Sequence, residues 1–370
     1  MNILFVLENY HPHIGGVEVV FKQLCEGLVR KGHIVEVVTH QLKGSKPFEK
    51  LNGVRIHRIN CFHNRYWFSF LAIPLVVRLA RQADIVHTTT YNGALPAKIA
   101  SRICRKPSVI TIHEILGSKW ISMGGMKFFS AKLHQILEWL IIHMGFSAVI
   151  AVSKSTQREL IERHIKSKII YNGIDYQLFN PRNANRRKIR SKLGLSESFV
   201  YIFYGRPGIS KGLECLLRAV PHISKIVKNS RLVAIVSKDE AYKRRYNLMV
   251  KLIHNLGIKD QVMLLDPVKH AELPDYIAAS DCVVVPSLSE GFGFSAAEAC
   301  AMGKPVVASN TTSLPEVVSG RYILARPGDP SSIAEGVISV AKGKVASHGK
   351  KVFRWEKTID SYENRYMQLT

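Results

Sequence analysis

Residues 281–309 read DCVVVPSLSEGFGFSAAEACAMGKPVVAS, and this stretch indicates the class of fold. It begins with an apolar run over 281–286, passes through a glycine-containing loop, continues as an alanine-rich segment, and ends in a second apolar run over 305–309. A strand, a loop, a helix and another strand make one βαβ unit, whose two strands pair in parallel. The stretch therefore predicts an α/β fold with a parallel sheet.

The same alternation of β-branched runs and amphipathic segments extends in both directions from this unit. The expected strands are Ile3–Leu7, Ile34–Thr39, Val54–Ile59, Asp84–Thr88, Val109–His113 and Ala148–Val152, followed by Phe199–Gly205, Arg231–Val236, Gln261–Leu264, Asp281–Pro286 and Pro305–Ser309. The polar, basic stretch Asn180–Lys192 separates the two series, and Val352–Leu369 resumes a helical pattern. At about 150 residues per domain, the pattern predicts two domains, 1–180 and 181–350.

Composition narrows the class of partner. Hydrophobic residues make up 46% of the 370, which suffices for a large core, and 52 Lys+Arg against 28 Asp+Glu give a net charge of +24. The excess lies in both halves rather than in one basic arm. This distribution argues against nucleic acid and favours anionic substrates, with an anionic membrane surface as a further partner.

The cysteines and the N-terminus bear on location. The six cysteines are far apart, without metal-ligand or disulfide spacing, as in a reducing cytoplasmic compartment. The apolar run Ile3–Leu7 is typical of a first strand rather than a signal peptide, and no stretch is long and apolar enough for a spanning helix. These observations predict a cytoplasmic protein.

Two loops carry residue types that suit phosphate. Gly15 and Gly16 precede a helix directly after the first strand, where backbone N–H groups can approach an anion; the alternative is an ordinary turn. Arg206 and Lys211 lie in the loop after Phe199–Gly205, and both could reach one anion unless they are simply solvated.

The third loop lies in the stretch quoted first. Glu290 precedes the glycines and Glu298 lies on the helix that they introduce. Carboxylates accept hydrogen bonds from vicinal hydroxyls, and the loop amides of Gly291, Phe292, Gly293 and Phe294 can hold phosphate or sugar oxygens. Two carboxylates around such a loop therefore suit a polyhydroxylated, phosphorylated ligand.

These motifs together resemble the retaining glycosyltransferases of family 4 (glycosyl transferases group 1), whose signature is two glutamates separated by seven residues, here Glu290 and Glu298. The segments Tyr171–Asp175 and Arg326–Pro330 match in order as well, so the resemblance covers nearly the whole chain. It implies the GT-B fold: two Rossmann-like domains with parallel sheets facing across a cleft, an acceptor-side domain over 1–180 and a nucleotide-sugar domain over 181–350. It also implies that helix 352–369 packs back on the first domain.

The resemblance also assigns roles to individual residues. Arg206 and Lys211 would bind the donor diphosphate, and Gly15 and Gly16 would approach it from the first domain. Glu298 would hold the ribose, and the amides of Gly291, Phe292, Gly293 and Phe294 would hold sugar and phosphate oxygens. Glu290 and His113 would lie beside the transferred sugar, although a histidine at the end of a strand is also common as a structural residue.

The reaction implied is transfer of a sugar from a nucleoside-diphosphate sugar to a glycan or lipid-linked acceptor, with no cofactor and no metal. Several positions depart from the family pattern: Thr89, Glu114, Ser237–Glu240 and Asp266. The last two lie where the family approaches the base, so the base and the donor sugar stay open. A nucleotide-sugar epimerase of the same fold is an alternative. A non-catalytic basic protein that binds membranes or polyanions is another.

Two apolar segments of the first half bear on the acceptor. Tyr66–Arg81 is aromatic and apolar with flanking arginines, and Trp120–Gly145 is a second region with many apolar residues and with Lys119, Lys127 and Lys132. Both are typical of an interfacial membrane contact, which would serve a lipid-linked acceptor. The alternative is that both are helices packed in the core.

Overall fold

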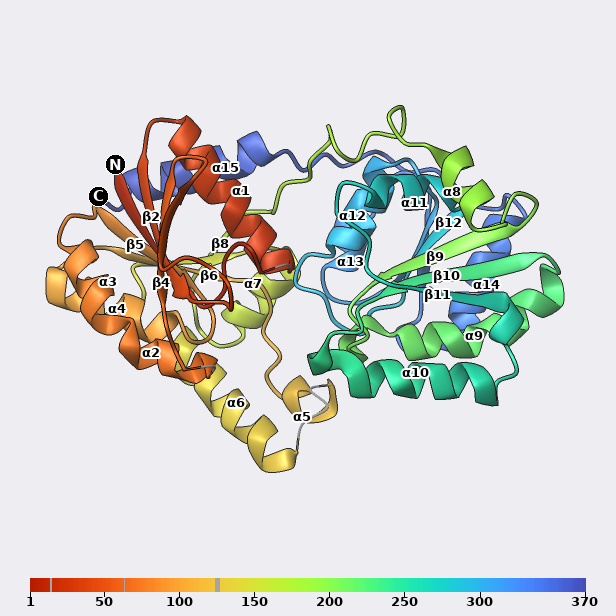
Figure 1. The fold of residues 1–370 in the computed structure, drawn as a ribbon, viewed down its shortest axis with the longest axis horizontal. Helices are drawn as coiled ribbons and strands as arrows, with labels where there is room; N and C mark the ends of the chain where they lie inside the picture. The colour runs from red at the N-terminus through yellow and green to blue at the C-terminus, as the bar shows by residue number, and fades with distance from the viewer. Residues whose placement is uncertain (14, 63, 124–126) are drawn as a thin grey trace. The chain divides into compact units, whose positions relative to one another are not determined.

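The computed structural model describes residues 1–13, 15–62, 64–123 and 127–370, and it divides the chain into two compact units (Figure 1). Unit 1 comprises Met1–Gly173 and Phe353–Thr370, and unit 2 comprises Ile174–Val352. The chain therefore enters unit 2 before the basic stretch Asn180–Lys192, a few residues earlier than the boundary expected at 180/181.

Helix α8 (Arg186–Lys192) explains why that basic stretch is not a linker. The Arg190 guanidinium is buried and donates to the carbonyl oxygens of Ala279 at 2.9 Å and Leu195 at 3.1 Å, while Arg186 pairs with Asp281 at 2.8 Å. The cations thus attach α8 to the body of unit 2.

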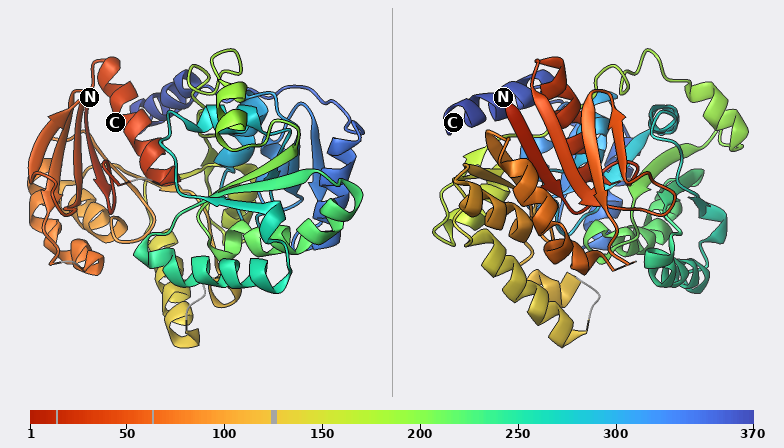
Figure 2. Two further views of the ribbon diagram at one scale, coloured as in Figure 1. Left: turned by 45° about the vertical axis from the view of Figure 1, so that its right-hand side comes forward. Right: turned by 60° about the vertical axis from the view of Figure 1, so that its left-hand side comes forward.

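Unit 1 is built around one sheet with helices on both faces (Figure 2). Its elements are β1 (Asn2–Leu7), α1 (Gly16–Arg30), β2 (Ile34–His40), β3 (Phe48–Leu51), β4 (Val54–Ile59), η1 (Arg65–Trp67), α2 (Phe68–Leu71), α3 (Ile73–Ala80), β5 (Ile85–Thr89), α4 (Ala94–Cys104), β6 (Ser108–Ile112), α5 (Lys119–Met123), α6 (Phe128–Ile142), β7 (Ala148–Ala151), α7 (Lys154–Ile161), β8 (Lys168–Ile169) and α15 (Trp355–Met367). The strand order over the described residues is β3-β4-β2-β1-β5-β6-β7-β8.

Unit 2 repeats this architecture with fewer strands. Its elements are α8, β9 (Phe199–Gly205), η2 (Ile209–Lys211), α9 (Leu213–Ile226), β10 (Ser230–Val236), η3 (Glu240–Tyr242), α10 (Lys243–Asn255), η4 (Lys259–Gln261), β11 (Val262–Leu265), α11 (Leu273–Ala279), β12 (Cys282–Val285), α12 (Phe294–Ala301), β13 (Val306–Ser309), α13 (Leu314–Val317), β14 (Tyr322–Ala325) and α14 (Pro330–Ala341). The strand order is β11-β10-β9-β12-β13-β14, and each neighbouring pair is parallel.

Each strand expected from the sequence is present to within one residue at either end, and β3, β8 and β14 were not expected. Strand β3 pairs antiparallel with β4 through Asn52 and Gly53, whose φ angles are +49° and +86°. Positive φ at both positions is the backbone of a tight hairpin turn, which the dipeptide Asn-Gly favours. That dipeptide was the overlooked signal for β3.

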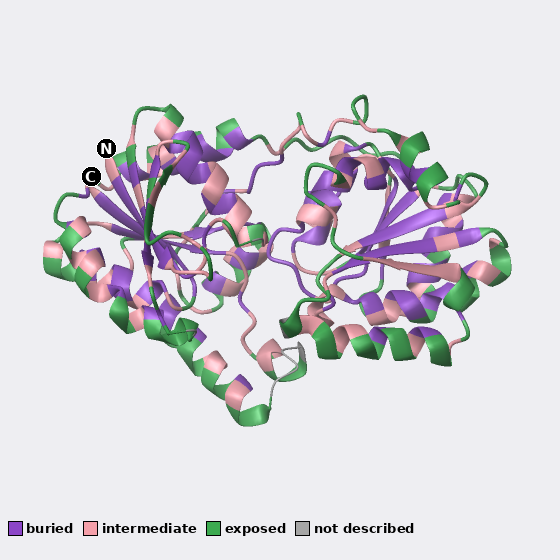
Figure 3. Ribbon diagram, in the orientation of Figure 1, coloured by how far each residue is buried: buried purple, intermediate pink, exposed green. Residues whose placement is uncertain are grey.

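The cores explain why the strands form. The strands of both sheets are largely buried, as Figure 3 shows, because helices cover both faces and leave only the edges to solvent. In unit 2, Tyr201 of β9, Leu217 of α9 and Val337 of α14 belong to one buried apolar cluster. Burial on both faces accounts for the continuous runs of valine and isoleucine in the sequence.

Helix α15 belongs to unit 1 although it follows unit 2 in the chain. Its Tyr362 and Tyr366 side chains are fully buried. The Tyr366 hydroxyl lies 2.5 Å from Nδ1 of His87, and the Tyr362 hydroxyl lies 3.0 Å from Oγ1 of Thr111. Against α1, a Cβ atom on Gly27 would lie 2.2 Å from Ile359, so α15 packs where only glycine fits.

In each sheet, strands are first added on one side of the first strand and then on the other side, so the strand order reverses there. In unit 1 the chain moves from β1 to β2 on one side and later to β5 on the other; in unit 2 the corresponding strands are β9, β10 and β12. In parallel α/β sheets, ligands bind outside the carboxyl ends of the strands at this reversal. The loops after β1 and β5, and those after β9 and β12, are therefore the places to search for a site.

Candidate active site

In unit 2, the loops after β9 and β12 approach each other closely. Gly212 has a φ of +68°, and a Cβ atom there would lie 1.9 Å from the carbonyl oxygen of Pro286. The Leu288 N–H also donates to the Ser210 carbonyl oxygen at 2.7 Å. These contacts place Lys211 against the loop that carries Glu290.

Lys211, Ser287 and Glu290 form one polar group, called here the Lys211 cluster. Lys211 Nζ lies 2.7 Å from Glu290 Oε1, and Ser287 Oγ donates to the same oxygen at 2.8 Å. The backbone of Glu290 is fixed as well, since its N–H donates to Thr312 Oγ1 at 3.0 Å and its carbonyl oxygen accepts from Ser313 Oγ at 2.9 Å. The Glu290 carboxylate is buried, so it is held rigidly beside a cation.

The glycine loop leads directly into α12. Gly293 is the residue before the helix and has a φ of +93°, which favours glycine, while the Phe292 and Phe294 rings pack edge to face at 5.2 Å. The first N–H groups of a helix have no partner within it, and the helix dipole is positive at this end. The loop from Gly291 to Phe294 therefore presents donors and partial positive charge next to the Lys211 cluster.

Glu298 lies one turn further along α12 and is almost completely buried. Burial raises its pKa to about 8, and the neighbouring Tyr204 hydroxyl lowers it by a smaller amount. Tyr204 donates to the Ser295 carbonyl oxygen at 2.7 Å, which fixes it against the helix. At pH 7 the unliganded Glu298 side chain is therefore mostly protonated, and it can donate as well as accept.

Arg206 occupies a different position from Lys211. It is exposed, and its guanidinium donates to the Tyr242 hydroxyl of η3 at 3.2 Å. The structure therefore directs Arg206 toward η3 and brings only Lys211 into the cluster with Glu290. In the motif Arg326–Pro330, Asp329 caps α14 by accepting from the N–H groups of Ser331 at 2.9 Å and Ser332 at 3.2 Å, which is a structural role.

In unit 1, Gly15 and Gly16 stand at the start of α1. A Cβ atom on Gly15 would lie 2.3 Å from Glu18 Oε2, so the end of the Glu18 side chain lies over the start of the helix. The other oxygen of Glu18 lies 3.0 Å from His13 Nδ1. A carboxylate thus lies at the helix end that the sequence assigned to a diphosphate.

His113 follows β6, and its ring packs against Phe21 of α1 at 5.8 Å. Burial lowers the pKa of His113 to about 4, and Glu18 opposes this shift. Among the residues that the structure describes, its buried Nε2 atom has no hydrogen-bond partner. A neutral imidazole with a spare nitrogen can bond to a ligand hydroxyl, whereas His87 already bonds to Tyr366 and to Thr111 at 2.9 Å.

Sequence reasoning overlooked a buried carboxylate at the end of β1. Glu8 accepts from Asn92 Nδ2 at 3.0 Å and pairs with Arg65 at 3.1 Å. Burial raises the pKa of Glu8, and Arg65 opposes that shift. Gly93 allows the loop after β5 to approach the end of β1, because a Cβ atom on this residue would lie 2.6 Å from the Val6 carbonyl oxygen. An acidic residue directly after the apolar run Ile3–Leu7 was the available signal.

No group of three or more His, Cys, Asp or Glu side chains within the described ranges could hold a metal ion. The six cysteines are unpaired thiols. The candidate site thus has two parts, each described within its own unit: Lys211, Glu290, Glu298 and residues 291–294 in unit 2, and Gly15, Gly16, Glu8 and His113 in unit 1.

Known protein families match both halves of the chain. The family model described as Glycosyltransferase Family 4 matches residues 14–178, and that described as Glycosyl transferases group 1 matches residues 185–357. An uncharacterized glycosyltransferase of Methanocaldococcus jannaschii is 33% identical over 91% of this chain and 88% of its own. A D-inositol 3-phosphate glycosyltransferase of Corynebacterium jeikeium is 28% identical over 96% of this chain and 92% of its own.

Solved structures show the same fold. HepE from Anabaena, in complex with UDP and glucose, superposes with a TM-score of 0.81 at 22% identity over 99% of both chains. The sucrose-phosphate synthase of Thermosynechococcus elongatus gives 0.79 at 20% identity, covering 100% of this chain and 98% of its own. Two α/β units of this topology with these neighbours make the fold GT-B. The two matched regions and the relative at 33% identity therefore show that this chain is a glycosyltransferase and belongs to glycosyltransferase family 4.

Proposed function

We propose that the protein transfers a sugar, with retention of configuration, from a nucleoside-diphosphate sugar to a glycan or lipid-linked acceptor. The observation that carries this proposal is the Lys211 cluster beside the N-terminus of α12, with the buried Glu298 on the same helix. A cation and the N–H groups at the positive end of a helix dipole suit the diphosphate, and the two carboxylates suit sugar hydroxyls. HepE in complex with UDP and UDP-glucose supports the nucleotide-sugar donor.

Stabilisation of the leaving group is the step that this site serves. As the bond to the sugar breaks, negative charge grows on the departing diphosphate, and Lys211 with the α12 amides is held in place to meet it. Arg206 would join by leaving Tyr242, since its exposed guanidinium is free to rotate. Glu290 would lie beside the sugar, where positive charge develops.

Unit 1 is proposed as the acceptor side, with Gly15 and Gly16 approaching the donor. Glu8, Asn92 and His113 offer a carboxylate, an amide and a neutral imidazole at the carboxyl edge of its sheet. These groups match the hydroxyls of a polyol or sugar acceptor. The relatives named as D-inositol 3-phosphate glycosyltransferase and as the phosphatidylinositol N-acetylglucosaminyltransferase GPI3 subunit support an acceptor of this kind.

We propose a cytoplasmic location, which the unpaired cysteines support.

The direct test is a thermal-shift screen of nucleoside-diphosphate sugars on the full chain. A ligand present at about 100 times its Kd should add about 2.7 kcal/mol to the free energy of unfolding, so the true donor should raise Tm clearly. The proposal fails if no nucleotide sugar stabilises the protein. Conversion of the donor to an isomer, without any acceptor, would instead identify an epimerase.

We expect transfer activity to survive EDTA. Lys211 and the α12 amides would neutralise the diphosphate, so a divalent cation should be unnecessary. The check is the initial rate of sugar transfer before and after dialysis against EDTA. Complete loss of activity that Mg²⁺ or Mn²⁺ restores would contradict this assignment.

Glu298 should make donor binding depend on pH. Its pKa of about 8 leaves about a tenth of the carboxyls ionised at pH 7, and the ionised form accepts the stronger hydrogen bonds from ribose hydroxyls. Donor affinity should therefore increase severalfold, up to about tenfold, between pH 7 and 9, and Glu298→Gln should bind more weakly without this increase. Calorimetry across this range measures it, and an unchanged pH profile in the variant would refute the assignment.

The same carboxyl should affect stability. Its folded-state pKa of about 8 exceeds the ordinary 4.5, so the folded chain holds this proton more tightly than the unfolded chain. The contribution is fully present below about pH 4.5 and is lost as the pH rises to 8. Glu298→Gln should therefore flatten the fall in Tm over this interval.

A further inference from the structure

Helix α6 has an outer surface that no described residue of unit 1 covers. Its Ala131, Ile141 and Ile142 side chains face the unit, whereas seven large apolar side chains are between 42% and 85% exposed. They are Phe128, Phe129, Leu133, Ile136, Leu137, Trp139 and Leu140, called here the α6 face. Figure 3 shows the exposed outer side of this helix. A soluble domain rarely leaves so many large apolar groups together on one helix without a partner.

The η1–α2 segment continues this surface. Tyr66, Trp67, Phe70 and Leu71 are exposed, and the Tyr66 hydroxyl lies 3.4 Å from Nε2 of His134 on α6. The same segment also contributes to the core, since Phe68, Ala72 and Val76 are completely buried. The alternative of core packing therefore holds for Phe68, Ala72 and Val76, whereas the exposed residues of 66–81 lie on the surface of unit 1. The α6 face together with these four residues is called the apolar platform.

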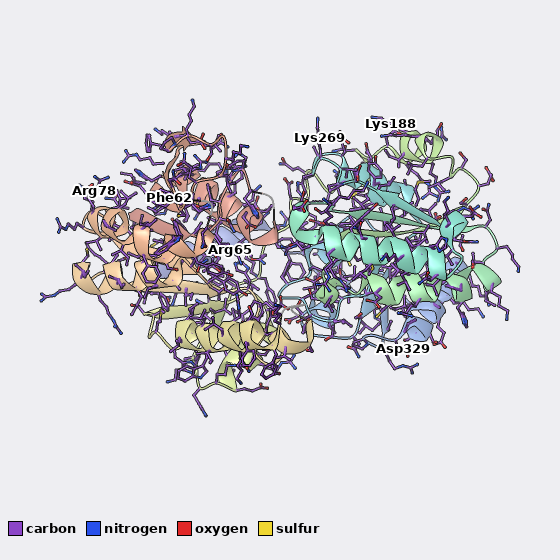
Figure 4. The ribbon with its side chains drawn as sticks, turned by 60° about the horizontal axis from the view of Figure 1, so that its bottom comes forward. Phe62, Arg65, Arg78, Lys188, Lys269 and Asp329 are labelled. Atoms are coloured by element: carbon purple, nitrogen blue, oxygen red, sulfur yellow. The ribbon has the colours of Figure 1, made fainter. Side chains whose placement is uncertain are left out.

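The charges around the platform have one sign. Residues 60–83 contain no Asp or Glu, and residues 115–158 contain only Glu138. Glu138 is buried and accepts from the N–H groups of Leu116 at 3.0 Å and Gly117 at 2.7 Å, so its carboxylate does not reach the surface. Lys127, Lys132 and Arg78 are exposed, and Figure 4 labels Arg65 and Arg78 on this unit. The two segments that form the platform, 60–83 and 115–158, thus combine apolar and cationic groups with no exposed acid of their own.

We propose that the apolar platform docks on the surface of an anionic phospholipid bilayer. Fifteen residues make α6 about 22 Å long. No helix in the described part of the chain is long and apolar enough to cross a membrane, so α6 would lie in the plane of the interface. Exposed Trp67 and Trp139 suit the headgroup level, and the lysines suit anionic lipids. If a second copy of the chain bound the platform through the same surface, the cationic groups of the two copies would repel each other, so an anionic bilayer is the better partner.

Docking would also bring lipid close to the proposed acceptor groups. Arg65 begins η1 within the platform segment and pairs with Glu8 at the end of β1. The headgroup of a lipid-linked acceptor would therefore meet Glu8 and Asn92 next to the membrane surface. Only this consequence rests on the proposed function, because membrane binding by the platform requires no sugar or nucleotide.

Flotation of the full chain with vesicles tests the proposal. The protein should float with phosphatidylglycerol–phosphatidylcholine vesicles at 0.1 M salt and less at 1 M, since the Debye length falls from about 10 Å to about 3 Å. Phe129→Ser, Leu133→Ser and Trp139→Ser combined should reduce the partition coefficient about tenfold or more. The matched control is Ile226→Ser, Leu248→Ser and Val250→Ser, three exposed apolar positions of unit 2. This control should float like the wild type.

Measuring nucleotide binding by the same variants distinguishes a failure of the membrane proposal from a failure of the proposed function. Both triple variants should bind the nucleotide as the wild type does, which also shows that they fold. If the platform variant does not fold, fluorescence of the wild type with brominated lipid replaces it: quenching is expected, and Trp139→Phe should reduce it. The proposal is overturned if the wild type does not bind anionic vesicles, or if both triple variants float alike. A concentration-dependent dimer abolished by the platform substitutions, without vesicle binding, would overturn it in favour of self-association.

Discussion

Lys211→Ala should lower kcat/KM by about 10²–10³-fold, the usual effect of removing one fixed charge that stabilises developing negative charge. Lys211 is held 2.7 Å from Glu290 before any ligand binds, so its position needs no rearrangement during the reaction. Removing it withdraws a cation from the leaving diphosphate and leaves the buried Glu290 carboxylate without its ion pair. Steady-state kinetics with varied donor, together with calorimetry, measure both effects.

Substitution of the two glutamates should change different kinetic constants. Glu290→Gln should mainly lower kcat, because a charge beside the sugar is felt most in the transition state, and Glu298→Gln should mainly raise KM. Lys228→Ala, which removes an exposed cation of unit 2, is the control and should leave both constants unchanged. If Glu290→Gln keeps its kcat but no longer binds donor, the two roles are assigned wrongly.

Gly212→Ala should destabilise unit 2 and abolish tight donor binding. The new Cβ atom would lie 1.9 Å from the Pro286 carbonyl oxygen, and the φ of +68° is unfavourable for alanine. Backbone strain and overpacking each cost about 1–3 kcal/mol, so the thermal midpoint should fall by roughly 5–15 °C. Any relaxation must separate the two loops, which would move Lys211 away from Glu290.

Gly257→Ala isolates the contribution of that contact. Gly257 has a φ of +64° but nothing within 4 Å of its Cβ position, so it shares the backbone strain without the collision. We expect a small decrease in Tm and an unchanged donor Kd for this control. Equal destabilisation by the two substitutions would show that the approach of Gly212 to Pro286 is unimportant.

The sequence determined the fold class and the positions of most strands. A strand buried on both faces needs a continuous β-branched run, and Cys282–Val285 is such a run. Edge strands carry a weaker signal: β3 has only four residues, two of them charged, and none is buried, so only its Asn52–Gly53 turn distinguishes it. The glycine loop, Glu290 before it and Glu298 on α12 could also be recognised from the sequence, because their pattern is one of local spacing.

The tertiary structure alone decided which of these residues meet. Lys211 and Glu290 lie 79 positions apart, and they form a pair because β9 and β12 are neighbours at the reversal of the sheet. The same packing leaves Arg206 outside this pair and raises the pKa of Glu298 to about 8 by burial. In unit 1, the pairing of β1 with β5 brings Asn92 to Glu8. Local sequence specifies strands, turns and helix ends through short-range sterics and hydrogen bonds. Burial and long-range contacts depend on how those elements pack, and that packing sets the ionisation and the partners of the site.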